Sequence, residues 1–196
     1  MAKKLRLFVA VELPEAAKSG LGKVIDALNS SDIHGIRTVR SDGIHLTLKF
    51  LGDVDADRVD AVTDALSKAI AGHAPFRLEL GEVGAFPTLR RPRVLWVGIN
   101  GDTEALASLQ SDIEAALEAA GFAGDDRSYN PHLTLARVRP SIRNGPPPPS
   151  GKSAADVLKG TPIEPGTFIP VERVSLMRTE LHPDGAIHRR LVSIPL

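Results

Sequence analysis

Residues 44–51 read IHLTLKFL, a stretch that indicates both a β-strand and a functional site. β-Branched, aromatic and leucine side chains dominate it, as in a half-buried strand. Side chains of a strand alternate between its two faces. Regular alternation gives this strand a core face made of Leu46, Leu48 and Phe50. It gives the strand a polar face made of His45, Thr47 and Lys49.

The string His-Leu-Thr-Leu occurs a second time, at residues 132–135 within PHLTLAR. Alternation there places His132 and Thr134 on one face of a second strand. One such strand alone is most simply a solvent-facing strand. The two copies, however, begin 87 positions apart in a chain of 196 residues, so each half of the chain supplies one. A distant repeat of this kind predicts two related lobes that each contribute half of one site.

The composition is that of a globular protein with a sizeable core. Apolar residues make up 42% of the 196 positions, enough for one domain or two small lobes that share a core. The net charge is zero, which argues against indiscriminate binding along nucleic acid. The chain has no cysteine, so disulfides, thiolate nucleophiles and cysteine-ligated metals are excluded. No segment approaches the roughly 20 apolar residues of a membrane span, and we expect a cytoplasmic protein.

Strand and helix patterns alternate along the chain, as in an α+β fold with mostly antiparallel pairing. Besides the two motif strands, we expect strands at residues 5–13, 36–40, 76–86, 93–99, 169–181 and 187–195. We expect helices from Pro14 to about Asn29, from Asp53 or Asp55 to about Ala71, and over residues 102–120. Residues 140–151, PSIRNGPPPPSG, are expected to form a proline-rich loop.

Two histidines on matching strands suit acid–base chemistry at phosphorus. The unperturbed pKa of histidine, about 6.5, lies near physiological pH. One neutral imidazole can take a proton from an attacking water, while a protonated imidazole gives one to the leaving oxygen. Phosphoryl transfer also needs hydrogen-bond donors for the equatorial oxygens. We therefore expect His45 and His132 to be catalytic and Thr47 and Thr134 to bind the phosphate.

A metal site is the less favoured alternative. Zinc and iron prefer clusters of histidine and carboxylate ligands, whereas threonine accompanies each histidine here. The nearest acidic residues, Asp42, Asp53 and Asp126, are expected on loops. We therefore expect neither a metal nor a cofactor.

The strings HLTLKFLG (45–52) and PHLTLAR (131–137), with RLFVAVELP (6–14) at the start, resemble the 2H phosphoesterases. In particular, they resemble the bacterial and archaeal RNA 2′,3′-cyclic phosphodiesterases, also called 2′-5′ RNA ligases. The resemblance includes FPTLRRPRVLWVGI (86–99) and the C-terminal hairpin, and so extends over nearly the whole chain. The paired motif at this spacing is a specific signal, which either copy alone is not.

The resemblance implies a single bilobal, pseudo-symmetric catalytic domain over residues 1–196, with two antiparallel sheets facing a central groove and helices outside. It implies hydrolysis of a terminal 2′,3′-cyclic phosphate on RNA ends or nucleotides to a 2′-phosphate, without metal or ATP. The same histidines would serve the reverse 2′-5′ ligation. We expect a monomer that binds no membrane.

The resemblance also assigns residues. It favours His45 as the acid and His132 as the water-activating base, with Thr47 and Thr134 on the phosphate. Arg137 carries over as a further phosphate contact. Regular alternation places Arg137 on the face opposite His132, so this role requires a β-bulge or a strand end.

Some positions depart from the family pattern or lie outside the motifs. Thr179 and His188 stand where relatives often carry serine and tyrosine, and the proline-rich insert at 146–149 is unusual. We expect the histidines outside the motifs to be surface residues, namely His34, His73, His182 and His188. The arginines at 90, 91 and 93 fit an RNA path and a solvated loop equally well.

The alternative function is a non-catalytic nucleotide- or RNA-binding module that uses the same pocket. The presence of two intact acid–base groups argues against this alternative, because a binding module needs neither group.

Overall fold

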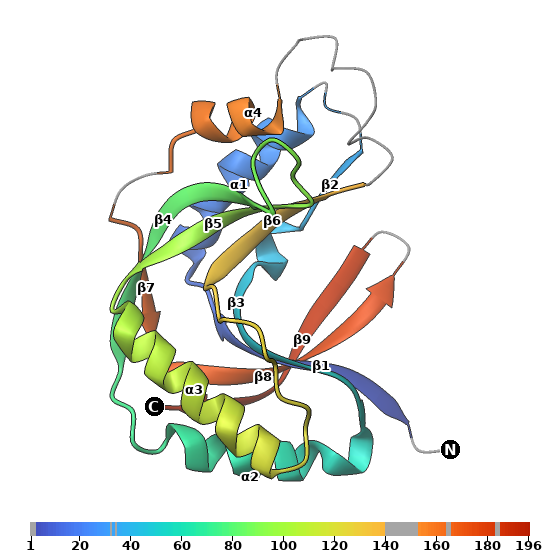
Figure 1. Cartoon of the computed structure of the whole chain (residues 1–196), viewed down its shortest axis with the longest axis vertical. Helices are drawn as coiled ribbons and strands as arrows, with labels where there is room; N and C mark the ends of the chain where they lie inside the picture. The colour runs from blue at the N-terminus through green and yellow to red at the C-terminus, as the bar shows by residue number, and fades with distance from the viewer. Residues whose placement is uncertain (1–2, 32, 34, 140–152, 164–165, 183–184) are drawn as a thin grey trace.

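In the computed structural model of the chain, residues 3–31, 33, 35–139, 153–163, 166–182 and 185–196 are described. Two antiparallel sheets form the framework of this part of the chain (Figure 1). Sheet A has the order β3 (His45–Asp55), β1 (Lys4–Glu12), β8 (Arg173–His182) and β9 (Gly185–Pro195). Sheet B has the order β2 (Ile36–Thr38), β6 (His132–Val138), β5 (Val94–Gly101), β4 (Phe76–Phe86) and β7 (Phe168–Val171). Each sheet therefore contains one motif strand, as predicted.

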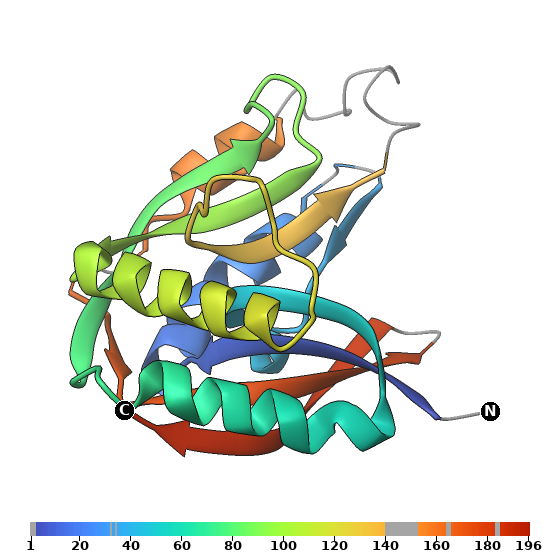
Figure 2. The ribbon, with the colours of Figure 1, turned by 60° about the horizontal axis from the view of Figure 1, so that its bottom comes forward.

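Helices cover one face of each sheet. Helices α1 (Glu15–Asn29) and α4 (Ala154–Gly160) pack against sheet B. Helices α2 (Val59–Ile70) and α3 (Thr103–Ala119) lie side by side and pack against sheet A (Figure 2). We call the other face of each sheet, which carries the motif histidine and threonine, its motif face. The α+β class with two antiparallel sheets is confirmed.

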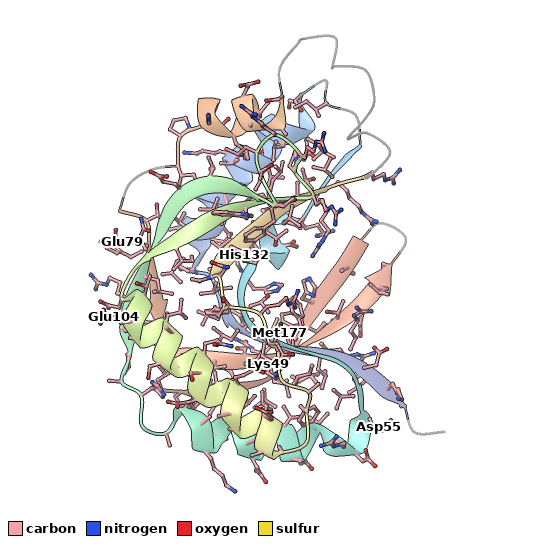
Figure 3. The ribbon with its side chains drawn as sticks, in the orientation of Figure 1. Lys49, Asp55, Glu79, Glu104, His132 and Met177 are labelled. Atoms are coloured by element: carbon pink, nitrogen blue, oxygen red, sulfur yellow. The ribbon has the colours of Figure 1, made fainter. Side chains whose placement is uncertain are left out.

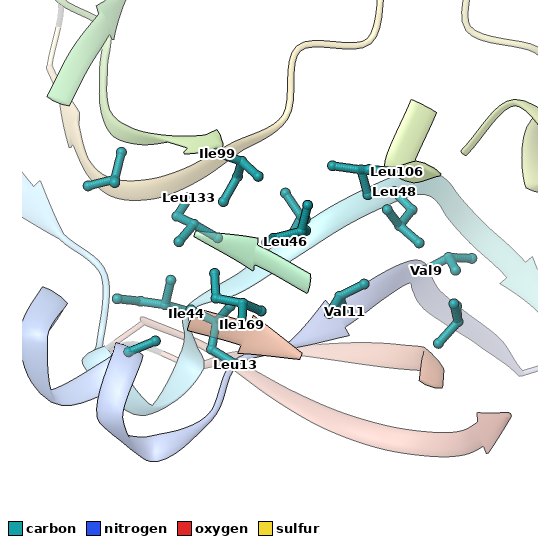
Figure 4. Packing of buried hydrophobic residues seen from close by; sticks show 14 of the residues in the cluster. Val9, Val11, Leu13, Ile44, Leu46, Leu48, Ile99, Leu106, Leu133 and Ile169 are labelled. Atoms are coloured by element: carbon teal, nitrogen blue, oxygen red, sulfur yellow. The ribbon is translucent and has the colours of Figure 1, made fainter. Parts of the chain in front are cut away.

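Most buried apolar side chains form one core that continues from sheet A into sheet B, and Phe8, Ala10 and Met177 form a small separate cluster. Leu46 of β3 and Leu133 of β6 are fully buried members of the same cluster (Figure 4). The apolar stripe of α3 joins this core through Leu106, Leu109, Ile113 and Leu117. Burial of this continuous apolar surface is the main term holding the two lobes together.

Both motif strands contain a β-bulge at the leucine that follows the motif threonine. In sheet A, Thr47 pairs with Ala10 and Lys49 with Val9, which leaves Leu48 as the extra residue. An extra residue interrupts the alternation, so side chains after it change face. The expectation that Phe50 faces the core and Lys49 the polar side was therefore wrong. Phe50 is 67% exposed, and Lys49 is 4% exposed on the core side.

The buried Lys49 ammonium ties sheet A to the segment that leads into the second motif. It pairs with the Glu114 carboxylate of α3 and donates to the carbonyl of Ala123 over 2.8 Å. Glu114 also accepts the backbone N–H of Asp125 over 2.9 Å. This network anchors the loop before β6 to sheet A.

Several elements differ from expectation. The expected strand at 169–181 is divided, because the chain leaves sheet B after β7 and enters sheet A as β8. Helix α2 begins at Val59 instead of near residue 55, because β3 continues to Asp55 and a 3-10 helix (Ala56–Arg58) follows it. Helix α4 was not predicted, although Ser153 and Asp156 form a capping box that signals it. The proline-rich segment 140–151 lies outside the described residues.

Within the described residues, no helix is long and apolar enough to cross a membrane.

Removing Lys49 tests the buried ion pair. Lys49→Ala leaves Glu114 without its cation, and we expect the free energy of unfolding to fall by about 3 kcal/mol. Urea denaturation followed by circular dichroism measures this loss. The double substitution Lys49→Met with Glu114→Gln removes both charges and should recover most of it. Arg127→Ala, which breaks an exposed pair with Asp125, is the control and should change little. If Lys49→Ala lowers the free energy of unfolding no more than Arg127→Ala does, the anchoring role is contradicted.

Candidate active site

The two motif histidines have the same backbone partner. Nδ1 of His45 lies 2.8 Å from the carbonyl of Gly43, and Nδ1 of His132 lies 2.8 Å from the carbonyl of Asn130. A carbonyl only accepts, so each neutral ring carries its proton on Nδ1. Nε2 is then the basic nitrogen of each ring. The two motif histidines therefore share the same tautomer as well as the same position in the repeat.

On the motif face of sheet A, His45 lies among aromatic rings. Its centroid is 4.5 Å from that of Phe8 and 4.9 Å from that of His188, which meets it edge-on. His188 is held by Thr179, whose hydroxyl lies 3.2 Å from His188 Nδ1. The expectation that His188 is a surface histidine was wrong: it is half-buried and packs directly on a motif histidine. The pairing of β8 with β9 brings it there, and the sequence motif gave no sign of it.

This environment keeps His45 neutral. Burial lowers the pKa of His45 from 6.5 to about 4, and the neighbouring His188 acts in the same direction. The Gly43 carbonyl and the Glu12 carboxylate oppose the shift only in part. Burial also lowers the pKa of His188. Both rings are therefore uncharged at pH 7 in the unliganded protein.

On the motif face of sheet B, His132 packs edge-on against Phe86, with ring centroids 4.9 Å apart. Trp96 lies behind the pair, with its ring centroid 5.1 Å from that of Phe86 and 6.4 Å from that of His132. Gly84 makes room for the indole, since a Cβ there would lie 2.3 Å from the Trp96 ring. Figure 3 shows His132 at the edge of sheet B that points toward sheet A.

A hydrogen bond connects the motif regions of the two sheets. The Tyr129 hydroxyl, just before the second motif, donates to the carbonyl of Thr47 over 3.1 Å. Tyr129 thus packs locally, and burial raises its pKa. Gly185 of the β8–β9 hairpin lies near sheet B as well, since a Cβ added there would be 3.8 Å from Arg37 Nη2 of β2. The two motif strands also pack against each other.

The second bulge places Arg137 on the motif face. Thr134 pairs with Trp96 and Ala136 with Leu95, so Leu135 is the extra residue. Arg137 follows the bulge and is exposed on the face that carries His132 and Thr134. The bulge that its phosphate-binding role requires is therefore present. Phe50 occupies the equivalent position of the first motif.

A sequence profile of the 2′-5′ RNA ligase superfamily matches residues 8–183. An RNA 2′,3′-cyclic phosphodiesterase from Methanothermobacter thermautotrophicus is 32% identical over 94% of this chain and 95% of its own length. The chain belongs to the 2′-5′ RNA ligase superfamily. An RNA 2′,3′-cyclic phosphodiesterase from Thermus thermophilus is 30% identical over 98% of this chain and 90% of its own length.

Solved structures agree with this membership. A crystal structure of a Thermus thermophilus protein superposes with a TM-score of 0.73 at 30% identity, covering 98% of both chains. Apo E. coli LigT superposes with a TM-score of 0.74, covering 100% of this chain and 99% of that chain. At 22% identity the second likeness shows the fold alone.

Other candidate residues lie apart from the motifs. His73 bonds Asp112 over 2.8 Å, and His182 is exposed; His34 lies outside the described residues. The arginines at 90, 91 and 93 lie on the loop between β4 and β5 and are exposed. Where the structure describes the chain, no group of three histidine or acidic side chains could hold a metal ion.

Histidine NMR titration tests the burial of His45. We expect the His45 ring signal to titrate near pH 4 in the unliganded protein. Because this pKa lies below the unfolded value of about 6.5, only the unfolded chain takes up this proton between about pH 6.5 and 4. The contribution of His45 to stability is therefore full above about pH 6.5 and lost as pH falls toward 4. His45→Phe should flatten that part of the stability profile. A His45 titration near pH 6.5, its ordinary value, would contradict the buried environment.

Proposed function

We propose that this protein is an RNA 2′,3′-cyclic phosphodiesterase that opens a terminal cyclic phosphate to a 2′-phosphate. The observation that carries the proposal is the duplicated His-x-Thr strand, one in each sheet, with Nδ1 bonded and Nε2 basic in both copies. The relatives above carry this activity in their names. The substrates would be RNA ends or nucleotides with a 2′,3′-cyclic phosphate.

The proposed hydrolysis uses the two imidazoles on opposite sides of one phosphorus. Water attacks in line with O3′, and Nε2 of His132 accepts its proton. Nε2–H of His45 protonates O3′, the P–O3′ bond breaks, and the phosphate remains on O2′. Thr47, Thr134 and Arg137 donate to the other phosphate oxygens. With a 5′-hydroxyl in place of water as the nucleophile, the same groups join RNA ends through a 2′-5′ linkage as the P–O3′ bond breaks.

The acid role of His45 couples protonation to substrate binding. Its pKa of about 4 means that the free protein holds His45 neutral at pH 7. An anionic phosphate beside the ring raises that pKa, because it stabilises the imidazolium. Either assignment requires one protonated imidazole, so the ring that takes up the proton on binding separates the two. Proton uptake at the His45 ring supports His45 as the acid.

The exposed Phe50 ring provides an apolar platform on the same face. Its centroid is 6.2 Å from that of Phe8, the ring that also supports His45. Any of the four nucleobases can stack on such a ring.

We further propose that the chain acts as one bilobal catalytic unit, as a monomer in the cytoplasm.

Substitution of each histidine tests the proposal. We expect His45→Ala and His132→Ala each to lose at least about a hundredfold in turnover of an oligonucleotide with a terminal 2′,3′-cyclic phosphate. The double variant should lose little more, because the two groups act as a unit. Products are resolved by the position of the phosphate, and EDTA should leave the wild-type rate unchanged. His73→Ala is the matched control outside the site.

Two results would contradict the scheme. If EDTA abolished turnover and added metal restored it, the histidines would be metal ligands and not an acid–base pair. Tight binding of the oligonucleotide by wild-type protein without turnover would favour the alternative, a non-catalytic RNA-binding module.

A further inference from the structure

Two arginines lie directly opposite each other at the edge of sheet B. Arg37 of β2 pairs with Arg137 of β6 in the antiparallel register. Side chains of directly opposed residues share a face, with their Cβ atoms about 5 Å apart. Arg137 faces the motif side, so Arg37 does too. Its neighbour Thr38 points the other way and bonds Asn29 of α1.

This pair is destabilising unless an anion joins it. Like charges placed directly opposite each other in a sheet repel. Among the described residues, no ion pair includes either Arg37 or Arg137. Arg178 and Arg189 also lie directly opposite each other, in sheet A, but both pair with the Glu180 carboxylate at 3.0–3.2 Å. Among the described residues, Arg37 and Arg137 thus differ from that pair in having no carboxylate between them.

The arginine pair lies beside the proposed phosphate site but does not coincide with it. Arg137 comes three residues after Thr134, and the bulge between them leaves roughly 7–10 Å of strand. Arg37 is one strand further out and reaches toward Gly185 of the β8–β9 hairpin. An anion held by both guanidiniums would sit next to the reacting phosphate, beside Gly185 of the hairpin.

We propose that Arg37, together with Arg137, forms a second anion site for the phosphate on the 5′ side of the terminal nucleotide. The inference rests on the proposed function. An RNA end carries a phosphate ester there, whereas a nucleoside cyclic phosphate with a free 5′-hydroxyl does not. Two guanidinium forks can bind one phosphate with several charge-assisted hydrogen bonds. Arg137 then binds both phosphates, whereas Arg37 binds only the phosphate on the 5′ side.

A minimal pair of substrates tests the site. The probes are adenosine 2′,3′-cyclic phosphate and the same molecule with a 5′-phosphate. We expect the wild type to favour the 5′-phosphorylated probe by about ten- to a hundredfold in kcat/KM, the range of one charge-assisted contact. Arg37→Ala should bring this ratio close to one, and Arg37→Lys should restore part of it. Arg137→Ala should lower turnover of both probes.

Arg189→Ala is the matched control, because it removes an exposed strand arginine of the β8–β9 hairpin that is already paired with a carboxylate. It should leave both rates unchanged. The second site would be overturned if the wild type had nearly equal kcat/KM for the two probes. It would also be overturned if Arg37→Ala lowered kcat/KM equally for both. If the wild type turns over neither probe, the proposed hydrolysis fails instead. Titration calorimetry with adenosine 2′-phosphate and adenosine 2′,5′-bisphosphate then tests the anion site on its own, with equal affinities contradicting it.

Discussion

A β-bulge one residue after each motif threonine determines which side chains share the motif faces. In β3 the bulge at Leu48 sends Lys49 into the core and brings Phe50 to the face of the first motif. In β6 the bulge at Leu135 buries Ala136 and brings Arg137 to the face of the second. A regular strand would bury Phe50 and remove Arg137 from the site. The repeated geometry thus gives each motif face an additional side chain, aromatic on one and cationic on the other.

The same bulge connects the site to the stability of the fold. Lys49, turned inward, meets Glu114, which also holds the backbone of the loop before β6. Tyr129 at the end of that loop bonds the carbonyl of Thr47. A polar path therefore runs from the first motif strand through α3 and the loop to the second motif. The two motif strands are held in place relative to each other by this path as well as by the shared apolar core.

The sequence was sufficient to predict the α+β class, the motif strands and most helices, because hydrophobic periodicity is a local signal, and the family resemblance supplied the two-sheet arrangement. It was not sufficient for features that depend on pairing between distant strands. The bulges are visible only in the register of β3 with β1 and of β6 with β5. His188 contacts His45 only because β9 pairs with β8. Likewise, only the register of β2 with β6 shows that Arg37 lies opposite Arg137. The capping box at Ser153 is a local signal for α4, readable from the sequence alone.

The central claim is that His45 and His132 act on one phosphate. The most direct test is NMR titration of the wild type with adenosine 2′-phosphate, following the ring signals of both histidines. The account predicts that both signals move along one binding curve and that the pKa of His45 rises from about 4 toward neutrality as the anion binds. Movement of only one signal, or two curves with different affinities, would contradict a shared site.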